Sequence, residues 1–247
     1  VELNAAQSRF ISNVSHELRT PLFNIKSYVE TLHDMGDQLS EEDRKEFLGV
    51  ANSETDRLTR LVNDVLDLSR LESNRVVQFS PVDLRPGLEQ ALRSYQLNAS
   101  DKQVELSLEA NRDLPDILGN WDLILQVLDN LIGNALKFSR SGGRLTVRAY
   151  TWPDSCQMGP SEADIDSNDG PTCILSSPLP KIRVEVCDTG YGISQESQQR
   201  IFERFYRVEN AVHTEVGTGL GLSIVRGILE KHGSMISMAS EPDIGTT

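Results

Sequence analysis

One histidine of this chain stands in a setting suited to phosphorylation. It lies in the stretch Phe10-Ile-Ser-Asn-Val-Ser-His-Glu-Leu-Arg-Thr-Pro-Leu22, where apolar residues recur at steps of three and four, as in an amphipathic helix. His16 is two residues from Val14, so at about 100° per residue it points away from the apolar stripe. The adjacent Glu17 can orient the imidazole and accept a proton. Pro21 removes one helical hydrogen bond, which predicts a bend.

Another predicted helix, much later in the chain, runs from about Trp121 to Phe138 and carries three polar residues on one face. Asn130, Asn134 and Lys137 stand at i, i+4 and i+7 of an otherwise apolar pattern. Amide oxygens can ligate Mg²⁺ and a lysine can contact phosphates. Taken alone, buried asparagines that tie helices together are a fair alternative.

A glycine-rich turn follows a hydrophobic strand at Asp188-Thr-Gly-Tyr-Gly-Ile193. Asp188 can accept a hydrogen bond from an adenine amine, while Gly190 and Gly192 let the backbone approach the base. By itself the pattern Asp-x-Gly-x-Gly indicates only a turn.

A second glycine-rich segment opens a later helix, whose free N–H groups and positive end suit a phosphate. Its candidate phosphate-binding residues are Gly217, Thr218, Gly219, Leu220 and Gly221. Between the two glycine-rich segments lies Ile201-Phe-Glu-Arg-Phe-Tyr-Arg207. Its aromatic residues could anchor a flexible lid and place Arg204 and Arg207 near phosphates.

Composition narrows the class of protein. The 247 residues carry 37 acidic against 24 basic side chains, a net charge of -13, so duplex nucleic acid is not an expected partner. No apolar run approaches the roughly 20 residues that span a membrane. Three scattered cysteines fit neither a disulfide framework nor a zinc site, and indicate a reducing compartment. The chain begins at Val1 inside a predicted helix, so we expect a fragment.

The first 75 residues predict a helical hairpin. One helix runs from residue 1 to about 33, and Ser40 begins a second that follows a heptad rhythm to about Glu72. Each helix carries an apolar stripe too wide for the partner helix alone to cover. We expect a homodimer with a four-helix bundle, the alternative being that the hairpin docks on the rest of its own chain.

Residues 76–247 predict an α/β sandwich, with helices on one face of a mixed sheet. The expected helices are 84–99, 121–138 and 220–232, and the expected strands are 82–84, 104–109, 144–150, 182–188 and 235–239. Residues 151–180 interrupt a hairpin with five prolines, five acids and no Lys or Arg, which predicts a mobile acidic loop. That loop is either a docking element for a partner or a solvated insertion with no binding role.

The segment around His16 resembles the phosphoacceptor box of sensor histidine kinases, His-Glu-x-x-Thr-Pro, here His16, Glu17, Thr20 and Pro21. The resemblance implies that His16 accepts a phosphoryl group and that Glu17 is the general base. It also implies that Thr20 positions water when the kinase works in reverse as a phosphatase.

The order and spacing of the other motifs resemble the N, G1, F and G2 boxes of the histidine-kinase catalytic domain, of the gyrase, Hsp90 and MutL-like ATPase fold. The resemblance implies Mg²⁺ on Asn134 with Asn130 beside it, ATP phosphate on Lys137, and adenine on Asp188. The detailed sequence resembles the NblS-type stress sensors of cyanobacteria and red-algal plastids, for example in the segment Arg60-Leu-Val-Asn-Asp-Val-Leu-Asp-Leu-Ser-Arg-Leu-Glu72.

Two departures from the family pattern stand out. Val216 replaces a frequent glycine, which would stiffen the lid. The chain also stops at Gly245-Thr-Thr247, where the family continues into a final strand, and a missing strand would leave a sheet edge open.

The resulting hypothesis is Mg-ATP-dependent autophosphorylation of His16, followed by transfer to an aspartate of a response regulator, expected to be of the OmpR type. The localisation implied is the cytoplasmic portion of a membrane-anchored protein. A gyrase- or Hsp90-type ATPase is a rival, disfavoured because the amide of Asn130 stands where those enzymes carry a water-activating glutamate. A pseudokinase scaffold is the other rival.

The remaining histidines and cysteines are weaker candidates. His33 also precedes an acid but lacks the Thr-Pro sequel, whereas His213 and His232 are expected to be structural or solvated. Cys156 and Cys173 could form a redox pair or be ordinary thiols.

Overall fold

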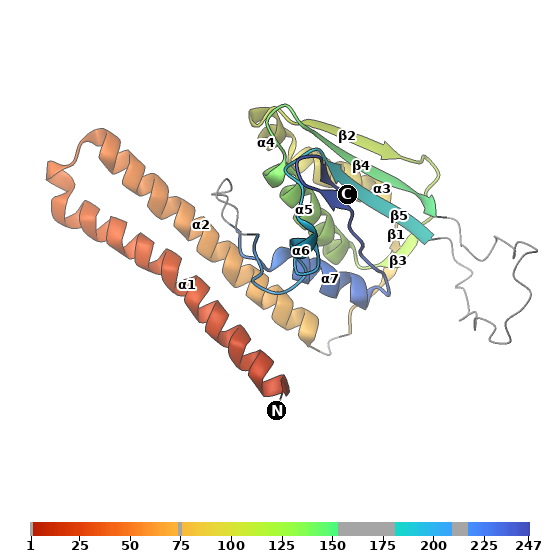
Figure 1. The fold of residues 1–247 in the computed structure, drawn as a ribbon, viewed down its shortest axis with the longest axis horizontal. Coiled ribbons are helices and arrows are strands. Elements are labelled where there is room, and N and C mark those ends of the chain that lie inside the picture. The colour runs from red at the N-terminus through yellow and green to blue at the C-terminus, as the bar shows by residue number, and fades with distance from the viewer. Residues whose placement is uncertain (1, 74–75, 153–180, 209–216) are drawn as a thin grey trace, which may run out of the picture. The chain divides into compact units, whose positions relative to one another are not determined.

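The computed structural model describes residues 2–73, 76–152, 181–208 and 217–247 (Figure 1). Its contacts divide the chain into two compact units, Val1–Val76 with Glu196–Ile236, and Val77–Gln195 with Ser237–Thr247. Most of the predicted acidic loop lies outside the described residues, as do Cys156, Cys173, His213 and Val216.

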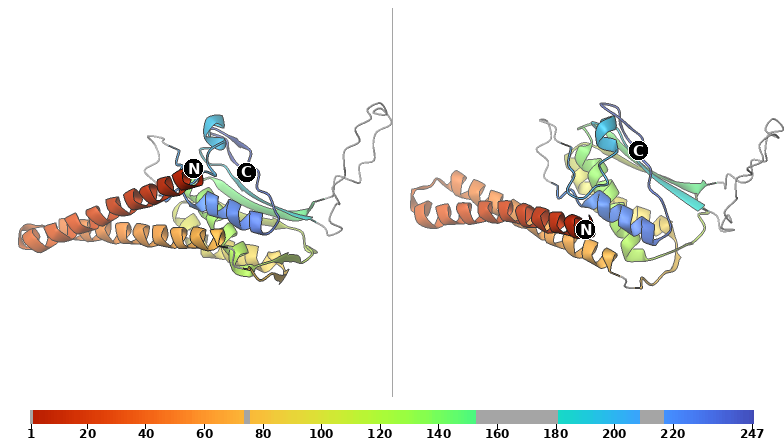
Figure 2. Two further views of the ribbon diagram at one scale, coloured as in Figure 1. Left: turned by 90° about the horizontal axis from the view of Figure 1, so that it is seen from below. Right: turned by 60° about the horizontal axis from the view of Figure 1, so that its bottom comes forward.

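The first unit contains the predicted helical hairpin. Helix α1 (Glu2–Met35) and helix α2 (Glu41–Glu72) are joined by a 3₁₀ turn, η1 (Gly36–Gln38), and run side by side in every view (Figures 1 and 2). Ser40 caps α2, its hydroxyl accepting the N–H of Asp43 at 3.0 Å, as the sequence predicts. Arg44 ties the turn to α2 by donating to the carbonyl of Gly36. The hairpin prediction is confirmed.

The two helices share a narrow apolar seam. Ala51, Leu61 and Leu68 of α2 are buried, and Pro21 of α1 is fully enclosed. Tyr28 and Phe47 add a tilted ring contact, with centroids 5.3 Å apart. Helix α1 continues through Pro21, whose missing N–H leaves the carbonyl of the residue four positions earlier without its helical partner.

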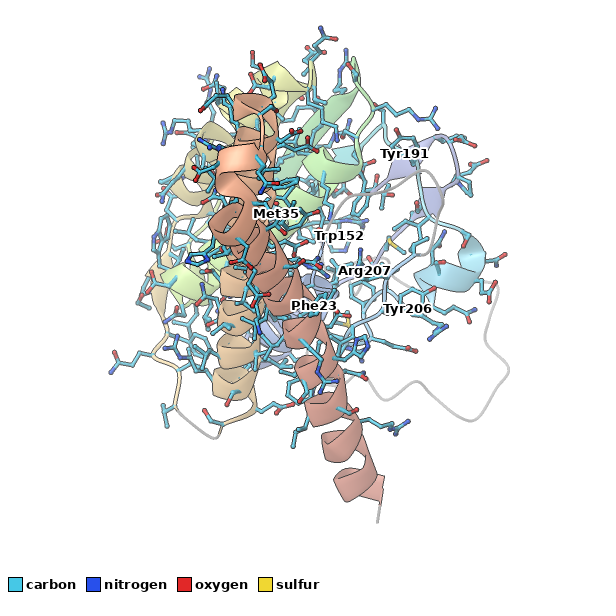
Figure 3. The ribbon with its side chains drawn as sticks, turned by 90° about the vertical axis from the view of Figure 1, so that its left-hand side faces the viewer. Phe23, Met35, Trp152, Tyr191, Tyr206 and Arg207 are labelled. Atoms are coloured by element: carbon cyan, nitrogen blue, oxygen red, sulfur yellow. The ribbon has the colours of Figure 1, made fainter. Side chains whose placement is uncertain are left out.

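Large apolar side chains remain exposed along both helices. Phe23 of α1 is 69% exposed, and it is labelled in Figure 3 with Met35, which is also exposed. The others on the hairpin are Ile11, Leu22, Val29, Leu48, Val62 and Leu66. Patches of this kind mark interaction surfaces more often than monomer surfaces.

The first unit also includes helix α7 (Gly221–Lys231), predicted at residues 220–232. Its side chains Ile224, Val225 and Ile228 are buried. Helix α7 packs against α2, and a Cβ at Gly227 would meet the Leu71 side chain at 3.5 Å, an ordinary van der Waals contact. Near the end of α7, Lys231 donates to the carbonyl of Ser73 at 3.3 Å.

The second unit is built on a mixed five-stranded sheet. Its strands, in spatial order, are β2 (Glu105–Ala110), β4 (Arg144–Trp152), β5 (Lys181–Asp188), β7 (Gly245–Thr246) and β6 (Ser240–Glu241). Strand β2 is parallel to β4 and the other pairs are antiparallel. Strand β1 (Ser80–Val82) forms a separate two-stranded sheet with β3 (Ile117–Gly119). The mixed sheet agrees with the predicted fold class.

Helices α3 (Leu84–Ser94), α4 (Gln96–Asp101) and α5 (Trp121–Phe138) lie on one face of this sheet (Figure 1). The core between helices and sheet consists of Leu88, Ala91, Leu92, Ala99, Val104, Leu128, Ile132, Ala135, Leu136, Leu145, Val147 and Ala149. The opposite face is polar, with Arg144 3.0 Å from Glu105 and Arg148 2.8 Å from Glu109.

Three local predictions differ from the structure. The helix expected at 84–99 is interrupted at Tyr95, where α3 ends and α4 begins. The strand expected at 82–84 lies at Ser80–Val82, and its partner β3 is too short to have been recognised. Residues 235–239 form no strand, because regular pairing with β7 begins at Ser240 and, of this segment, only Ala239 is described as bonded to Thr247.

Among the described helices, none combines the length and apolarity that crossing a membrane requires.

Candidate functional site

His16 lies on the solvent-exposed side of α1, as predicted. Thr20 is one helical turn later and also exposed, with its hydroxyl 3.5 Å from the carbonyl oxygen of His16. The helix therefore presents His16 and Thr20 to solvent on one stretch of surface, with Pro21 turned into the seam with α2.

Glu17 takes part in a chain of polar contacts that joins the two helices of the hairpin. Its Oε2 atom lies 3.3 Å from Nη2 of Arg57 on α2. The other guanidinium nitrogen, Nη1, lies 3.6 Å from Oε2 of Glu54, and Nδ2 of Asn24 donates to Oε1 of Glu54 at 3.2 Å. Arg57, Glu54 and Asn24 carry no signal in the sequence, because polar residues on amphipathic helices ordinarily face solvent.

The polar face of α5 is formed as predicted. The helix spans Trp121–Phe138, begins at the capping residue Asn120, and carries Asn130, Asn134 and Lys137 half-buried on one side. Nδ2 of Asn130 donates to the carbonyl of Gln126 at 2.9 Å, so its Oδ1 is the amide atom left to meet a ligand.

Lys137 and the end of α5 have further contacts. Nζ of Lys137 lies 5.1 Å from the ring centroid of Phe138. Lys102, which the sequence analysis did not single out, donates to the carbonyls of Leu136 (3.1 Å) and Lys137 (2.5 Å). This lysine caps the last turn of α5 and offsets its negative end.

Asp188 ends β5 and shapes the turn that follows it. Its Oδ1 accepts the N–H of Gly190 at 2.8 Å. Burial raises the pKa of the Asp188 carboxyl, while hydrogen bonds from the backbone at Gly190 and Thr246 act in the opposite direction.

The glycines of this turn are explained by contacts of the chain with itself. A Cβ at Gly190 would collide with the carbonyl oxygen of Phe138 at the end of α5, so only glycine allows the turn to lie against that helix. Gly192 follows in the same turn, and the N–H of Ile193 donates to Oγ of Ser240 at 2.8 Å. The second unit thus holds Asp188 and the end of α5 together.

The segment Gly217–Gly221 belongs to the first unit and leads directly into α7. Oγ1 of Thr218 donates to Oδ2 of Asp64 on α2 at 2.6 Å, and the N–H of Leu220 lies 3.3 Å from the same hydroxyl. Burial is the main cause that raises the pKa of Asp64, whereas the bond from Thr218 acts to lower it. Gly219 has a φ of +71°, and a Cβ there would lie 2.9 Å from Cα of Phe205.

The two predicted lid arginines differ in their surroundings. Arg204 lies 2.5 Å from Oε1 of Glu72 at the end of α2, and its guanidinium carbon is 5.6 Å from the ring centroid of Phe10. Arg207 is exposed and is labelled beside Tyr206 in Figure 3. The hydroxyl of Tyr206 donates to Oγ of Ser197 at 3.2 Å.

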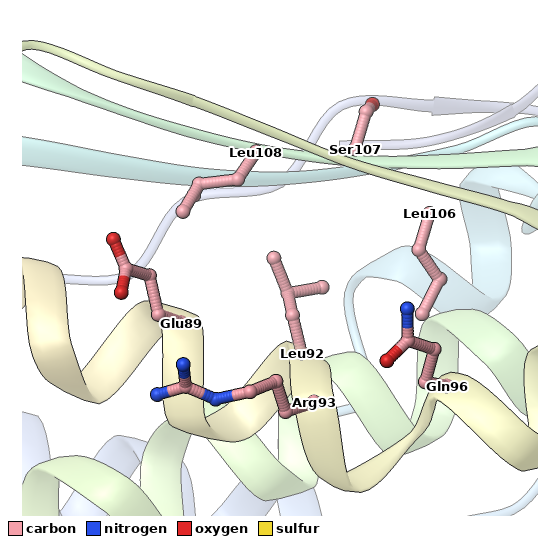
Figure 4. A pocket seen from close by; sticks show the side chains of 7 residues that line it. All are labelled: Glu89, Leu92, Arg93, Gln96, Leu106, Ser107 and Leu108. Carbon is pink, nitrogen blue, oxygen red and sulfur yellow. The ribbon is translucent and has the colours of Figure 1, made fainter.

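One cavity among the described residues is unrelated to these motifs. It measures 280 Å³ and opens between α3 and β2, lined by Glu89, Leu92, Arg93, Gln96, Leu106, Ser107 and Leu108. Figure 4 shows Leu92 from the helix and Leu106 and Leu108 from the strand pointing into it. A second hollow, of 510 Å³, lies over the polar face of the sheet and includes Asp188.

His33 and His232 each have a polar contact close to the end of a helix. Nδ1 of His33 is 2.7 Å from Oδ1 of Asp34 on an exposed turn. Nδ1 of His232 is 2.8 Å from the carbonyl of Ile228 at the end of α7, a structural contact. In the described part of the chain, no three His, Cys, Asp or Glu side chains are grouped so that they could hold a metal ion.

Two family models match the chain. Residues 6–74 match the His Kinase A (phospho-acceptor) domain, and residues 119–247 match the Histidine kinase-, DNA gyrase B-, and HSP90-like ATPase family.

Curated relatives match along the whole chain. Drug sensory protein A of Synechocystis is 58% identical over 247 residues, which is 100% of this chain and 35% of that protein. The sensor-like histidine kinase ycf26 of Pyropia yezoensis is 53% identical over 98% of this chain and 35% of its own length. The chain therefore spans about a third of these relatives.

Solved structures share the fold. Full-length ShkA in complex with AMPPNP matches with a TM-score of 0.62 and 28% identity, over 96% of this chain and 44% of its own. The histidine kinase ThkA in complex with the response regulator protein TrrA has a TM-score of 0.70 at 20% identity, over 99% of this chain and 61% of its own.

Proposed function

Because this chain belongs to the histidine kinases, we propose that it catalyses Mg-ATP-dependent phosphorylation of its own His16. The observation that carries the proposal is the position of His16, exposed on α1 and directly followed by Glu17, within the segment that matches the phosphoacceptor family. The same chain supplies an ATPase-family segment, so acceptor and nucleotide site belong to one molecule.

The nucleotide is assigned to the motifs singled out in the sequence. Asp188 would accept the adenine amine, and Gly190 and Gly192 would line the base. Amide oxygens suit Mg²⁺, which protein side chains commonly bind together with substrate phosphates. Asn134 is proposed as the Mg²⁺ ligand with Asn130 beside it, and Oδ1 of Asn130 is available because its nitrogen is bonded within the helix.

Phosphate contacts are assigned to positively polarised groups. Lys137 would contact phosphate directly, and the N–H groups at the start of α7, in the segment Gly217–Gly221, suit an anion. Arg204 and Arg207 are proposed to approach the phosphates when the lid takes its nucleotide-bound form. For Arg204 this requires release from Glu72.

The chemistry at His16 needs a nucleophilic nitrogen and a proton acceptor. One imidazole nitrogen forms the N–P bond as the bond from the γ-phosphorus to the ADP oxygen breaks, and the ring proton passes to Glu17. Mg-ATP supplies the phosphoryl group. Exposure of His16 leaves its ring open to approach from solvent.

A homodimer is proposed as the working form. The exposed apolar residues of α1 and α2, Phe23 among them, would be buried in a four-helix bundle formed by two hairpins. This proposal accounts for a stripe that the hairpin alone leaves in water.

Transfer to a partner completes the proposed cycle. We propose that the phosphoryl group passes from His16 to an aspartate of a response regulator, expected to be of the OmpR type. When the kinase acts as a phosphatase of that regulator, Thr20 would position the attacking water. The complex of ThkA with the response regulator protein TrrA supports this class of partner. The proposed location is the cytoplasmic portion of a membrane-anchored sensor, with any membrane segment in the part of the protein beyond this chain.

The test is incubation with γ-labelled Mg-ATP beside the variant His16→Gln, with nucleotide binding measured on both proteins. The expected result is label on the unaltered protein and none on the variant, at equal ATP affinity. ATP binding without label on the unaltered protein would instead indicate a pseudokinase, and rapid release of phosphate without a phosphoprotein would indicate a plain ATPase.

A further inference from the structure

Arg57 is the one cation that contacts the carboxylate of Glu17 among the contacts described above. The Arg57 side chain is only 16% exposed and that of Glu17 is 29% exposed, although the neighbouring His16 is exposed. At 3.3 Å the contact engages Oε2 of Glu17, and Oε1 takes no part in it. The rotamer of Glu17 is thus fixed from the opposite helix.

Arg57 is itself held in place from its other side. Glu54, one turn earlier on α2, is also 16% exposed and meets Nη1 of Arg57 at 3.6 Å. Oε2 of Glu54 is buried and has no hydrogen bond among the described residues, so the guanidinium is what balances its charge. Asn24, two turns after Glu17 on α1, bonds the remaining oxygen, Oε1. The result is a network of four polar side chains, in the order Glu17, Arg57, Glu54 and Asn24, whose first and last members lie on α1.

The charges in this four-residue network bear on proton transfer from His16. Glu17 can accept a proton only in its ionised form, and one guanidinium lies between two carboxylates. Without the guanidinium, no described cation would lie between the carboxylates of Glu17 and Glu54 at this interface. A buried ion pair adds little net stability compared with apolar packing. Stability alone is therefore a poor explanation for placing three charged groups beside the phosphoacceptor.

We propose that Arg57 is a positioning residue for the phosphorylation of His16, holding the Glu17 carboxylate oriented as the proton acceptor, with Glu54 and Asn24 fixing Arg57. The proposal rests on the proposed function, since it assigns a role within that reaction. Arg57 touches neither His16 nor the nucleotide in this account and acts through Glu17 alone.

The first experiment compares Arg57→Gln with the unaltered protein, measuring the initial rate of His16 phosphorylation over a range of Mg-ATP concentrations. Misplacing a catalytic group by about 1 Å can cost on the order of 100-fold in rate. We expect kcat to fall roughly 10- to 100-fold, with KM for ATP changed less than about twofold. Arg70→Gln is the matched control, because Arg70 is on the same helix, 71% exposed, and paired only with Asp67 in the described contacts.

A double variant separates positioning from a structural role. In a Glu17→Gln background the proton acceptor is already lost, so adding Arg57→Gln should lower kcat no further. An undiminished loss in that background would overturn the proposal, because it would show that Arg57 acts independently of Glu17.

Arg57→Lys keeps the charge and carries the test if Arg57→Gln fails to fold, as judged by circular dichroism. Lysine lacks the planar fork that meets Glu17 and Glu54 together, so we expect an intermediate kcat, several-fold below that of the unaltered protein. Unaltered kcat in a folded Arg57→Gln protein would refute the role of Arg57 and leave the proposed function standing. Absence of label from the unaltered protein would refute the proposed function, and the role of Arg57 with it.

Discussion

Replacing Asp188 with asparagine should separate nucleotide binding from folding stability. The side chain ends β5, and its Oδ1 holds the turn by accepting the N–H of Gly190 at 2.8 Å. Asparagine has the same shape and keeps this acceptor. It replaces the other oxygen with a donor, which cannot accept the amine of adenine.

The expected loss of affinity follows from the charge of that hydrogen bond. A hydrogen bond to a charged group contributes about 1.5–3 kcal/mol, so the Kd for ATP should rise roughly 10- to 150-fold in Asp188→Asn. Isothermal titration calorimetry measures this directly. Asp113→Asn is the control, since Asp113 is an exposed loop residue of the same unit.

The Asp188→Asn change should weaken ATP binding but leave the free energy of unfolding unchanged or raise it. Burial raises the pKa of Asp188 above 3.8, so the folded state prefers the protonated carboxyl. The stabilisation that comes from this preference is present at low pH and is lost as the pH rises through the raised pKa. At neutral pH the cost of burying the ionised carboxyl opposes folding. Asparagine removes that cost and keeps the hydrogen bond from Gly190, and the removed cost offsets any weakening of the hydrogen bond from Thr246. The melting temperature of Asp188→Asn should therefore equal or exceed that of the unaltered protein.

The pH dependence of binding provides a second check. Because the pKa of Asp188 is raised, ATP affinity should begin to fall on acidification at a higher pH than for an ordinary aspartate. An Asp188→Asn protein that binds ATP with unchanged Kd, or that loses binding only because it melts earlier, would refute the assignment of adenine to Asp188.

Two further predictions concern the first unit. Ser40→Ala removes the cap of α2 and should lower the free energy of unfolding by about 1 kcal/mol, measured by urea denaturation and contradicted by an unchanged midpoint. For Asp64, burial raises the pKa above 3.8, so its stabilising contribution is present at low pH and lost as the pH rises through the raised value. Asp64→Asn should thus flatten the pH dependence of unfolding above about pH 4, and a slope equal to that of the unaltered protein would count against this account.

Elements with strong local signals were predictable. Helix α5 has the predicted bounds, because Asn120 caps its start and an apolar pattern fills its length. The hairpin was equally clear from the Ser40 cap and the heptad rhythm. Elements that depend on a distant partner were not, and β3 is a case: three residues become a strand only by pairing with β1.

The residues of the candidate site likewise fall into those that local sequence predicts and those that depend on tertiary packing. His16 and the polar face of α5 follow from helical spacing, which a sequence displays. Arg57 does not, because its partner Glu17 is forty residues away and only the packing of the hairpin brings them to 3.3 Å. The glycines at 190 and 192 were expected for a bound base, whereas the structure also requires Gly190 for its approach to Phe138.

The most direct test of the central hypothesis is to map the phosphoryl group after incubation of the unaltered protein with Mg-ATP. Mass spectrometry under alkaline conditions should locate one phosphoryl group on His16, and the bond should be stable to base and labile to acid. Phosphate on serine, threonine or another histidine, or a modification that survives acid, would contradict the account.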